Sequence, residues 1–192
     1  MVQKKNRLFA WVCGLYVLPV VIAILFARLS EIQTFDLSLT VSLYVARYSW
    51  TAVLFFVHIL VVCLLFFQYI KKIKIKRIQK ILYLLVIACI LGCAWFPCNR
   101  SRSVICSDIH DIFSYLLVIA VALTFMTMLF CGSQKKQRIF AAGGLLYATV
   151  FILSFVFRIP MVKQSIFIWE NILILLLFTE LYLEMYYETS VV

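Results

Sequence analysis

The chain has little charge. Only 14% of its 192 residues are Asp, Glu, Lys or Arg, whereas 66% are hydrophobic and the mean hydropathy is +1.07. A soluble domain of this length needs a far more polar surface, because much of its exterior faces water. The composition therefore argues against an ordinary soluble protein and indicates an exterior that faces lipid. We expect residues 1–192 to form a single helical membrane domain, with no room for a separate soluble one.

Motifs that carry chemistry are also scarce. The seven Cys include no C-x-x-C pair, so the sequence lacks the paired thiols of common thiol oxidoreductases. It has only two His and no Ser nucleophile motif, which leaves neither a hydrolase signature nor a metal triad. We therefore predict no catalytic residue, no metal and no cofactor, and we favour a non-enzymatic role without excluding an enzyme.

Six long apolar stretches take up most of the chain. A hydrocarbon core about 30 Å thick needs roughly 20 helical residues. The stretches predict membrane-spanning helices at 8–27, 48–70, 79–97, 110–131, 139–157 and 167–187. The predicted fold class is all-α, a polytopic bundle of six transmembrane helices. Five spans would remain if one stretch lay along the interface.

Basic residues gather in three clusters between alternate members of these stretches. Twelve of the 18 Lys and Arg lie in them: Lys4, Lys5, Arg7, Lys71, Lys72, Lys74, Lys76, Arg77, Lys80, Lys135, Lys136 and Arg138. Because cytoplasmic loops are enriched in Lys and Arg, the clusters and both termini are predicted to be cytoplasmic. Anionic lipid headgroups then account for the net charge of +10 without nucleic acid. We expect an integral protein of the plasma (inner) membrane whose partners are lipids and a membrane protein or a second copy.

The first stretch differs from a cleavable signal peptide. Residues 8–27 are too many for an h-region, and no small-x-small site follows them. The next segment, 28–47, alternates apolar and polar residues from Phe35 to Val45, which is the period of a strand. An unpaired strand near lipid is costly, so a short interfacial helix fits this segment as well.

Two ionisable residues, His58 and Glu180, lie inside predicted spans. Each is ten residues from the outer end of its span, which places both about 15 Å below the outer surface. Ionisable groups at this depth usually face the bundle interior and often carry function. We predict an intramembrane polar pair, which either handles protons or a ligand or only locks two helices together. Glu184 and Glu188 continue from Glu180 at four-residue spacing toward the cytoplasm.

The densest polar group surrounds the start of the fourth span. Asp108 and Asp111 lie beside His110 there, and Arg47 and Glu170 lie at the outer ends of other spans. These five residues predict an outward-facing ligand-binding pocket. Helix capping is the competing interpretation, with Ser107 or Asp108 as the N-cap and the acids favoured by the helix dipole.

Two shorter features complete the sequence-based predictions. Cys98 and Cys106 share the external loop with seven residues between them, which makes them a candidate disulfide in an oxidising exterior. The small residues 141–144, at the start of the fifth span, predict close packing against another helix.

Several of these motifs resemble a known group. Phe96-Pro97 ending the third span, His110 opening the fourth, Asp36-Leu37-Ser38-Leu39 before the second, and Trp169-Glu170-Asn171 opening the sixth are similar to motifs of a mostly prokaryotic six-span family. It is catalogued as domain of unknown function nine-nine-eight. The resemblance implies a six-helix fold and lends no activity. This chain has Asn171 where the family shows Arg, and Cys98-Asn99 where it shows x-Asp, so no charge pairing is carried over. A more distant similarity is to the damage-regulated autophagy modulator group.

Three functions follow from these residues. The first is binding of a lipid, another apolar ligand or a partner helix through the outward-facing pocket. The second is a membrane-embedded lipid hydrolase or transferase that uses His110 and Asp111 as acid and base. The third is a small proton-coupled carrier that uses His58 and Glu180, although the chain shows no internal repeat of the kind carriers have.

Overall fold

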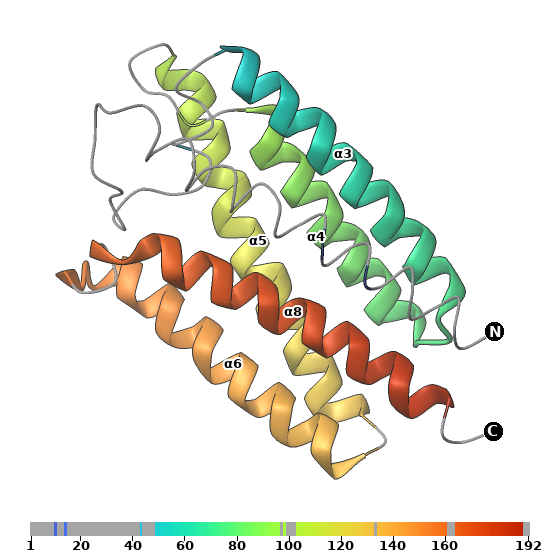
Figure 1. The fold of residues 1–192 in the computed structure, drawn as a ribbon. Coiled ribbons are helices and arrows are strands. Elements are labelled where there is room, and N and C mark those ends of the chain that lie inside the picture. The colour runs from blue at the N-terminus through green and yellow to red at the C-terminus, as the bar shows by residue number, and fades with distance from the viewer. Residues whose placement is uncertain are drawn as a thin grey trace.

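The computed structural model describes residues 49–96, 98, 103–132, 134–160 and 164–189, and the single positions 10, 14 and 43. Five long helices make up most of this part: α3 (Ser49–Lys72), α4 (Arg77–Trp95), α5 (Val104–Cys131), α6 (Lys135–Val156) and α8 (Ile166–Thr189). The described residues contain no strand. Figure 1 shows these helices side by side, tilted in the same general direction.

These helices are five of the six predicted spans. All five are long and apolar enough to cross a membrane. Their ends agree with the predicted ones to within two residues, except that α5 and α6 begin earlier. The predicted first span, 8–27, and the segment 28–47 lie outside the described residues apart from the single positions named above.

The start of α5 corrects one prediction. The helix begins at Val104, and the cap is Ser103, whose Oγ accepts a hydrogen bond from the Cys106 N–H at 3.2 Å. Neither Ser107 nor Asp108 is the cap, since the Ser107 hydroxyl donates to the Ser103 carbonyl at 3.1 Å from inside the helix. A prediction from apolar runs places the start of this helix too late, because an apolar run ends where polar residues begin. Here the polar residues continue the helix.

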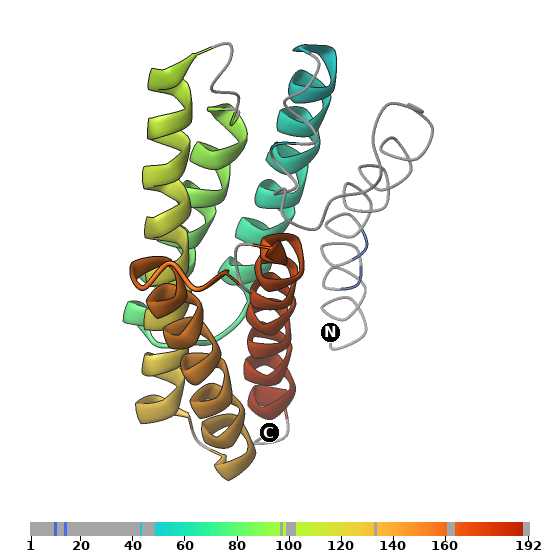
Figure 2. The ribbon, with the colours of Figure 1, turned by 90° about the vertical axis from the view of Figure 1, so that its left-hand side faces the viewer.

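Consecutive helices run antiparallel and pack on one another. α3 packs on α4, α4 on α5, α5 on α6, and α6 on α8, as Figures 1 and 2 show from two directions. α8 also packs against α5, and its Phe178 meets Phe66 of α3 edge-on with ring centroids 5.9 Å apart. The last helix therefore touches elements from both halves of the described chain.

The two ends of the bundle differ in charge. The α3–α4 turn, the α5–α6 turn and the end of α8 lie toward the lower right of Figure 1, and we call this the basic end. Its Lys and Arg are Lys71, Lys72, Lys74, Lys76, Arg77, Lys80, Lys135, Lys136 and Arg138. The opposite end carries Asp108, Asp111 and Glu170, and we call it the acidic end. Arg158 is the one Lys or Arg that the structure describes there.

Two glycines allow neighbouring helices to approach closely. A Cβ added to Gly144 of α6 would lie 2.5 Å from the ring of Phe125 in α5. A Cβ on Gly92 of α4 would likewise overlap the ring of Phe113 in α5. Of the predicted small-residue patch, Ala141 (0% exposed) and Gly144 face inward, whereas a Cβ on Gly143 would meet nothing. Only the inward face of the patch, with Ala141 and Gly144, therefore contributes to helix packing.

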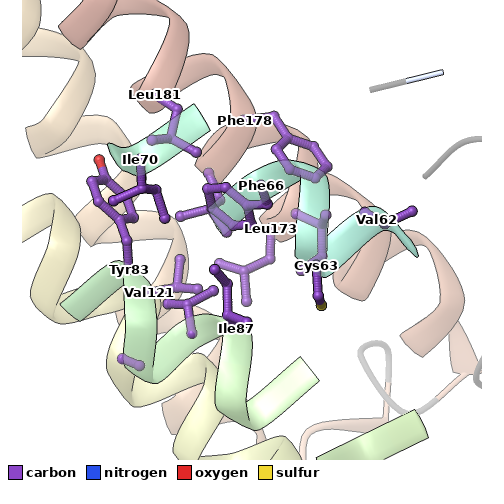
Figure 3. Packing of buried hydrophobic residues seen from close by; sticks show 14 of the residues in the cluster. Val62, Cys63, Phe66, Ile70, Tyr83, Ile87, Val121, Leu173, Phe178 and Leu181 are labelled. Atoms are coloured by element: carbon purple, nitrogen blue, oxygen red, sulfur yellow. The ribbon is translucent and has the colours of Figure 1, made fainter. Parts of the chain in front are cut away.

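The core is a cluster of apolar side chains to which α3, α4, α5, α6 and α8 all contribute. Figure 3 shows Phe66 and Ile70 of α3 beside Tyr83 and Ile87 of α4, with Val121, Leu173, Phe178 and Leu181 around them. The opposite, outward helix faces are also apolar. On α3 they form a stripe at helical spacing: Trp50, Val53, Leu54, Val57, Val61 and Leu64. Exposed stripes of this extent face hydrocarbon in membrane proteins, whereas soluble monomers rarely expose them.

The end of α6 has an unusual backbone. Arg158 adopts φ 52°, the left-handed conformation that normally falls to glycine. The Ile159 N–H donates to the Ser154 carbonyl at 2.9 Å, which is the six-to-one bond of a Schellman cap. The cap therefore satisfies a helix carbonyl. The Cβ of Arg158 makes this left-handed conformation unfavourable, whereas glycine would adopt it without that cost.

Candidate functional site

The side chain of His110, in α5, contacts backbone carbonyls at the end of the preceding helix, α4. The residue is 5% exposed, and its Nδ1 lies 2.9 Å from the Cys93 carbonyl oxygen and 2.8 Å from the Phe96 carbonyl oxygen. Both partners are carbonyl oxygens, which only accept, so Nδ1 must carry the proton. His110 thus satisfies two of the carbonyls at the end of α4 that have no partner within the helix.

This geometry changes the role expected of His110. The sequence indicated a ligand-binding group or a general base. In the structure, the ring lies between α4 and α5 and its Nδ1 contacts the backbone of α4. An acid/base role with Asp111 would depend on Nε2 alone, because Nδ1 is engaged by the backbone. Positioning the end of α4 is the function that the distances support.

Next to His110, polar groups from three helices come together. The Cys93 thiol of α4 lies 3.4 Å from the hydroxyl of Ser114 in α5. Asp111 of α5 and Glu170 of α8 both lie within electrostatic range of the Cys93 thiol. Both acids are partly buried. The structure therefore gathers His110, Asp111 and Glu170 in one region of the bundle.

The other predicted pocket residues differ. Asp108 is exposed, whereas Asp111, three residues along α5, is half-buried. Arg47 lies outside the described residues. Cys98 and Cys106 are both partly buried, and the disulfide between them stays a prediction.

Aromatic side chains line the start of α8 beside Glu170. Trp169 stacks on Tyr147 at 4.9 Å and on Phe151 at 6.0 Å between ring centroids, both from α6. The Tyr147 hydroxyl also donates to the Trp169 carbonyl at 3.1 Å. The Asn171 side chain donates to the Phe167 carbonyl at 2.7 Å within its own helix. These contacts hold the backbone that carries Glu170.

A second polar group lies deeper in the bundle, around Glu180 of α8. This side chain is 0% exposed, and its Oε2 lies 2.8 Å from the hydroxyl of Thr124 in α5. Tyr83 of α4 acts on the same carboxyl, but neither the Tyr83 hydroxyl nor Glu180 Oε1 completes a hydrogen bond of good geometry. Tyr69 of α3 in turn acts on Tyr83. Four helices therefore contribute to the surroundings of one buried acid.

Glu180 does not pair with His58. Its polar partners are Thr124 and Tyr83, at the level of Tyr69 near the end of α3. His58 precedes Tyr69 by eleven positions on that helix, a separation of about 16 Å along the axis. The equal depths expected from span ends fail because neighbouring helices are offset along their axes.

One turn closer to the basic end, Glu184 continues the acidic stripe of α8. Its Oε1 accepts a hydrogen bond from Gln79 Nε2 of α4 at 2.6 Å. The Gln79 Oε1 also accepts from the Lys76 N–H at 3.1 Å, which caps the start of α4. The stripe from Glu180 through Glu184 therefore leads from the core toward the basic turns.

Sequence reasoning missed Thr124, Tyr83 and Gln79. A Thr, a Tyr and a Gln within or beside apolar spans carry no charge and have no distinctive spacing. The one signal that points to them is the cost of burying Glu180, which requires polar partners from other helices. Among the residues that the structure describes, no three His, Cys, Asp or Glu side chains gather closely enough to hold a metal ion.

The chain matches no protein-family model, no curated protein and no solved structure. Its class therefore follows from its own features. Five long apolar helices, a shared core and apolar outward faces are the features of a multi-pass integral membrane protein.

Proposed function

We propose that this chain is a six-span membrane protein that binds a lipid headgroup at its acidic end, with its basic end and both termini in the cytoplasm. The lipid class that fits is one with an amine and a phosphate in its headgroup, such as phosphatidylethanolamine. The observation that carries the proposal is that Asp111 of α5 and Glu170 of α8, both half-buried, lie within electrostatic range of the same side chain, Cys93. Two carboxylates from different helices attract a positively charged group.

The orientation rests on charge. Nine described Lys and Arg lie at the basic end and Arg158 alone at the other. Loops rich in Lys and Arg stay in the cytoplasm. A first span at 8–27 makes the number of crossings even, which brings the N-terminus to the same side as the C-terminus. The six-span family that the sequence resembles has the same number of spans.

A reporter tests this topology. An alkaline phosphatase fused after Val192 should be inactive, and a fluorescent protein fused there should be fluorescent, because both report a cytoplasmic location. A second pair of fusions, placed after Lys74 in the α3–α4 turn, should behave in the same way. Active phosphatase at either place would overturn the proposed orientation.

The headgroup would sit where lipid meets water. Trp169, Tyr147 and Phe151 form a stacked aromatic group next to Glu170, as is common at membrane interfaces. The amine would lie between Asp111 and Glu170. Arg47, two residues before α3 in the sequence, would bind the phosphate.

Native mass spectrometry of the purified protein tests the lipid. Phosphatidylethanolamine should remain bound in preference to phosphatidylglycerol, which has no amine. The combined change of Asp111→Asn and Glu170→Gln should remove this preference, whereas Asp108→Asn, at an exposed site, should keep it. Equal retention of both lipids by the unaltered protein would refute the proposal, and so would a preference unaffected by the double change. Capture of a protein partner instead of a lipid would also count against it.

A further inference from the structure

Glu180 is buried where a charge would be poorly supported. Its side chain is 0% exposed, and no Lys or Arg of the described residues pairs with it. Oε1 meets no hydrogen-bond donor of good geometry, although the Tyr83 hydroxyl acts on this carboxyl group. An ionised carboxylate in such a place needs donors on both oxygens, because an uncompensated buried charge is strongly unfavourable.

The hydrogen-bond geometry indicates where the proton is. Thr124 Oγ1 lies 2.8 Å from the Val121 carbonyl and 2.8 Å from Glu180 Oε2. A hydroxyl has one proton, and the carbonyl can only accept. If Glu180 were ionised, this single proton would be shared between two acceptors. If Glu180 is protonated, Oε2–H donates to Thr124, the Thr124 hydroxyl donates to Val121, and each short contact contains a proton.

Polar side chains continue from Glu180 toward the basic end of the bundle. Glu184, one turn along α8, is half-buried and acts electrostatically on Glu180. It lies beside Gln79 and the α3–α4 turn at the basic end. In the other direction, α8 presents the buried apolar residues Leu177, Ile174 and Leu173 before Glu170 is reached. A proton on Glu180 therefore has polar groups between it and the basic end, and an apolar layer between it and the acidic end.

We infer that Glu180 is a proton-binding site that exchanges its proton with water at the basic end, through Glu184, and that it does not conduct protons across the bundle. On release, the proton passes from Glu180 to the Glu184 carboxylate and then to water, and Glu180 is left with a negative charge. The other groups acting on this site are Tyr83 of α4 and, through it, Tyr69 of α3. α5 contributes the Thr124 hydroxyl, and α6, which also packs on α8, contributes none of these groups. The bound proton joins α8 to α5, so its loss should loosen this pair.

Dicyclohexylcarbodiimide provides a test, because it modifies protonated carboxyl groups in apolar surroundings and leaves ionised, hydrated ones largely unmodified. In native membranes at neutral pH, mass spectrometry of peptides should find the label on Glu180 and not on Glu184. Glu180→Gln should abolish the label on that peptide. Absence of the label at Glu180 at both neutral and acidic pH would overturn the inference, provided that the reagent labels a control membrane protein in parallel.

Infrared spectroscopy is an independent measurement. The spectrum should contain a protonated carboxylic acid band that disappears in Glu180→Gln. Thr124→Val, which keeps the shape and removes the hydroxyl, should shift this band to higher frequency, whereas Thr124→Ser should restore it. A band of ionised carboxylate alone at this position would refute a bound proton.

Sealed vesicles of the two orientations test the direction of access. Raising the pH on the side of the basic end should suppress the label on Glu180, and Glu184→Gln should slow this suppression. Raising the pH on the acidic side alone should leave the label unchanged. Suppression from the acidic side would overturn the one-sided pathway and favour a through-conducting one.

Discussion

Gln79 Nε2 donates to Glu184 Oε1 across 2.6 Å and joins two residues that lie 105 positions apart in the sequence. One belongs to the first turn of α4 and the other to the last turns of α8. Since Gln79 also caps its own helix through Lys76, the same side chain sets a helix start and a helix–helix contact. It thereby links the basic turn to the stripe that leads to Glu180.

Gln79→Glu should destabilise the protein by about 1–3 kcal/mol, because it replaces a donor to a carboxylate by a second carboxylate. The cap acceptor is kept, so the loss reports the contact with Glu184. The double variant Gln79→Glu with Glu184→Gln reverses the direction of the hydrogen bond and should recover most of the loss. Chemical denaturation in detergent, analysed as a double-mutant cycle, measures the coupling. Additive effects would mean that the two side chains do not interact.

His110→Ala should cost roughly 1–3 kcal/mol, since it leaves the Cys93 and Phe96 carbonyls without their donor. His110→Asn places an amide N–H near the position of Nδ1 and should recover part of this stability. The midpoint of thermal unfolding in detergent, followed by circular dichroism, is the measurement. Equal losses for the two variants would contradict the capping role.

Gly144→Ala should be destabilising, because its Cβ would press on the fully buried ring of Phe125. Overpacking of this kind typically costs about 1–3 kcal/mol. Gly143→Ala is the matched control on the same helix, since its Cβ meets open space, and it should be neutral or slightly stabilising. The unfolding midpoint should therefore fall for Gly144→Ala and should not fall for Gly143→Ala. A neutral Gly144→Ala would show that α5 and α6 are less closely packed than described.

Arg158→Gly should stabilise the protein by about 1 kcal/mol, because glycine adopts φ 52° without the Cβ penalty. Arg158→Ala removes the same charge and keeps the Cβ, so it separates backbone relief from electrostatics. We expect a higher unfolding midpoint for the glycine variant than for the alanine variant. If the two midpoints coincide, the left-handed position carries no strain.

The helices could be predicted from the sequence, and the depth of their side chains could not. Apolar runs located five described spans because the hydrocarbon sets a length that composition reveals directly. The start of α5 was missed because the polar residues Ser107, Asp108, His110 and Asp111 follow its short apolar first turn. Axial offsets between neighbouring helices depend on packing, for example of Phe113 over Gly92, and this leaves no trace in hydropathy.

The candidate site was predictable in part for a related reason. Charged residues are conspicuous in apolar spans, so Glu180, Asp111 and Glu170 were found. Their partners were not found because Thr124 and Tyr83 are ordinary residues of helices, and only the fold brings them to Glu180. His110 was predicted as a ligand-binding residue, and nothing in the sequence indicated that its Nδ1 would contact the Cys93 and Phe96 carbonyls at the end of α4.

The short turn between α3 and α4 also fixes the topology of the protein once it has been inserted into the membrane. Lys71, Lys72, Lys74, Lys76, Arg77 and Lys80 are concentrated at this one turn. Carrying six such charges through the hydrocarbon would cost on the order of 15 kcal/mol, at roughly 2.5 kcal/mol each. A hairpin inserted in one sense therefore cannot turn over on a cellular timescale. All copies should share a single topology, without the dual-oriented populations seen where the charge bias is weak.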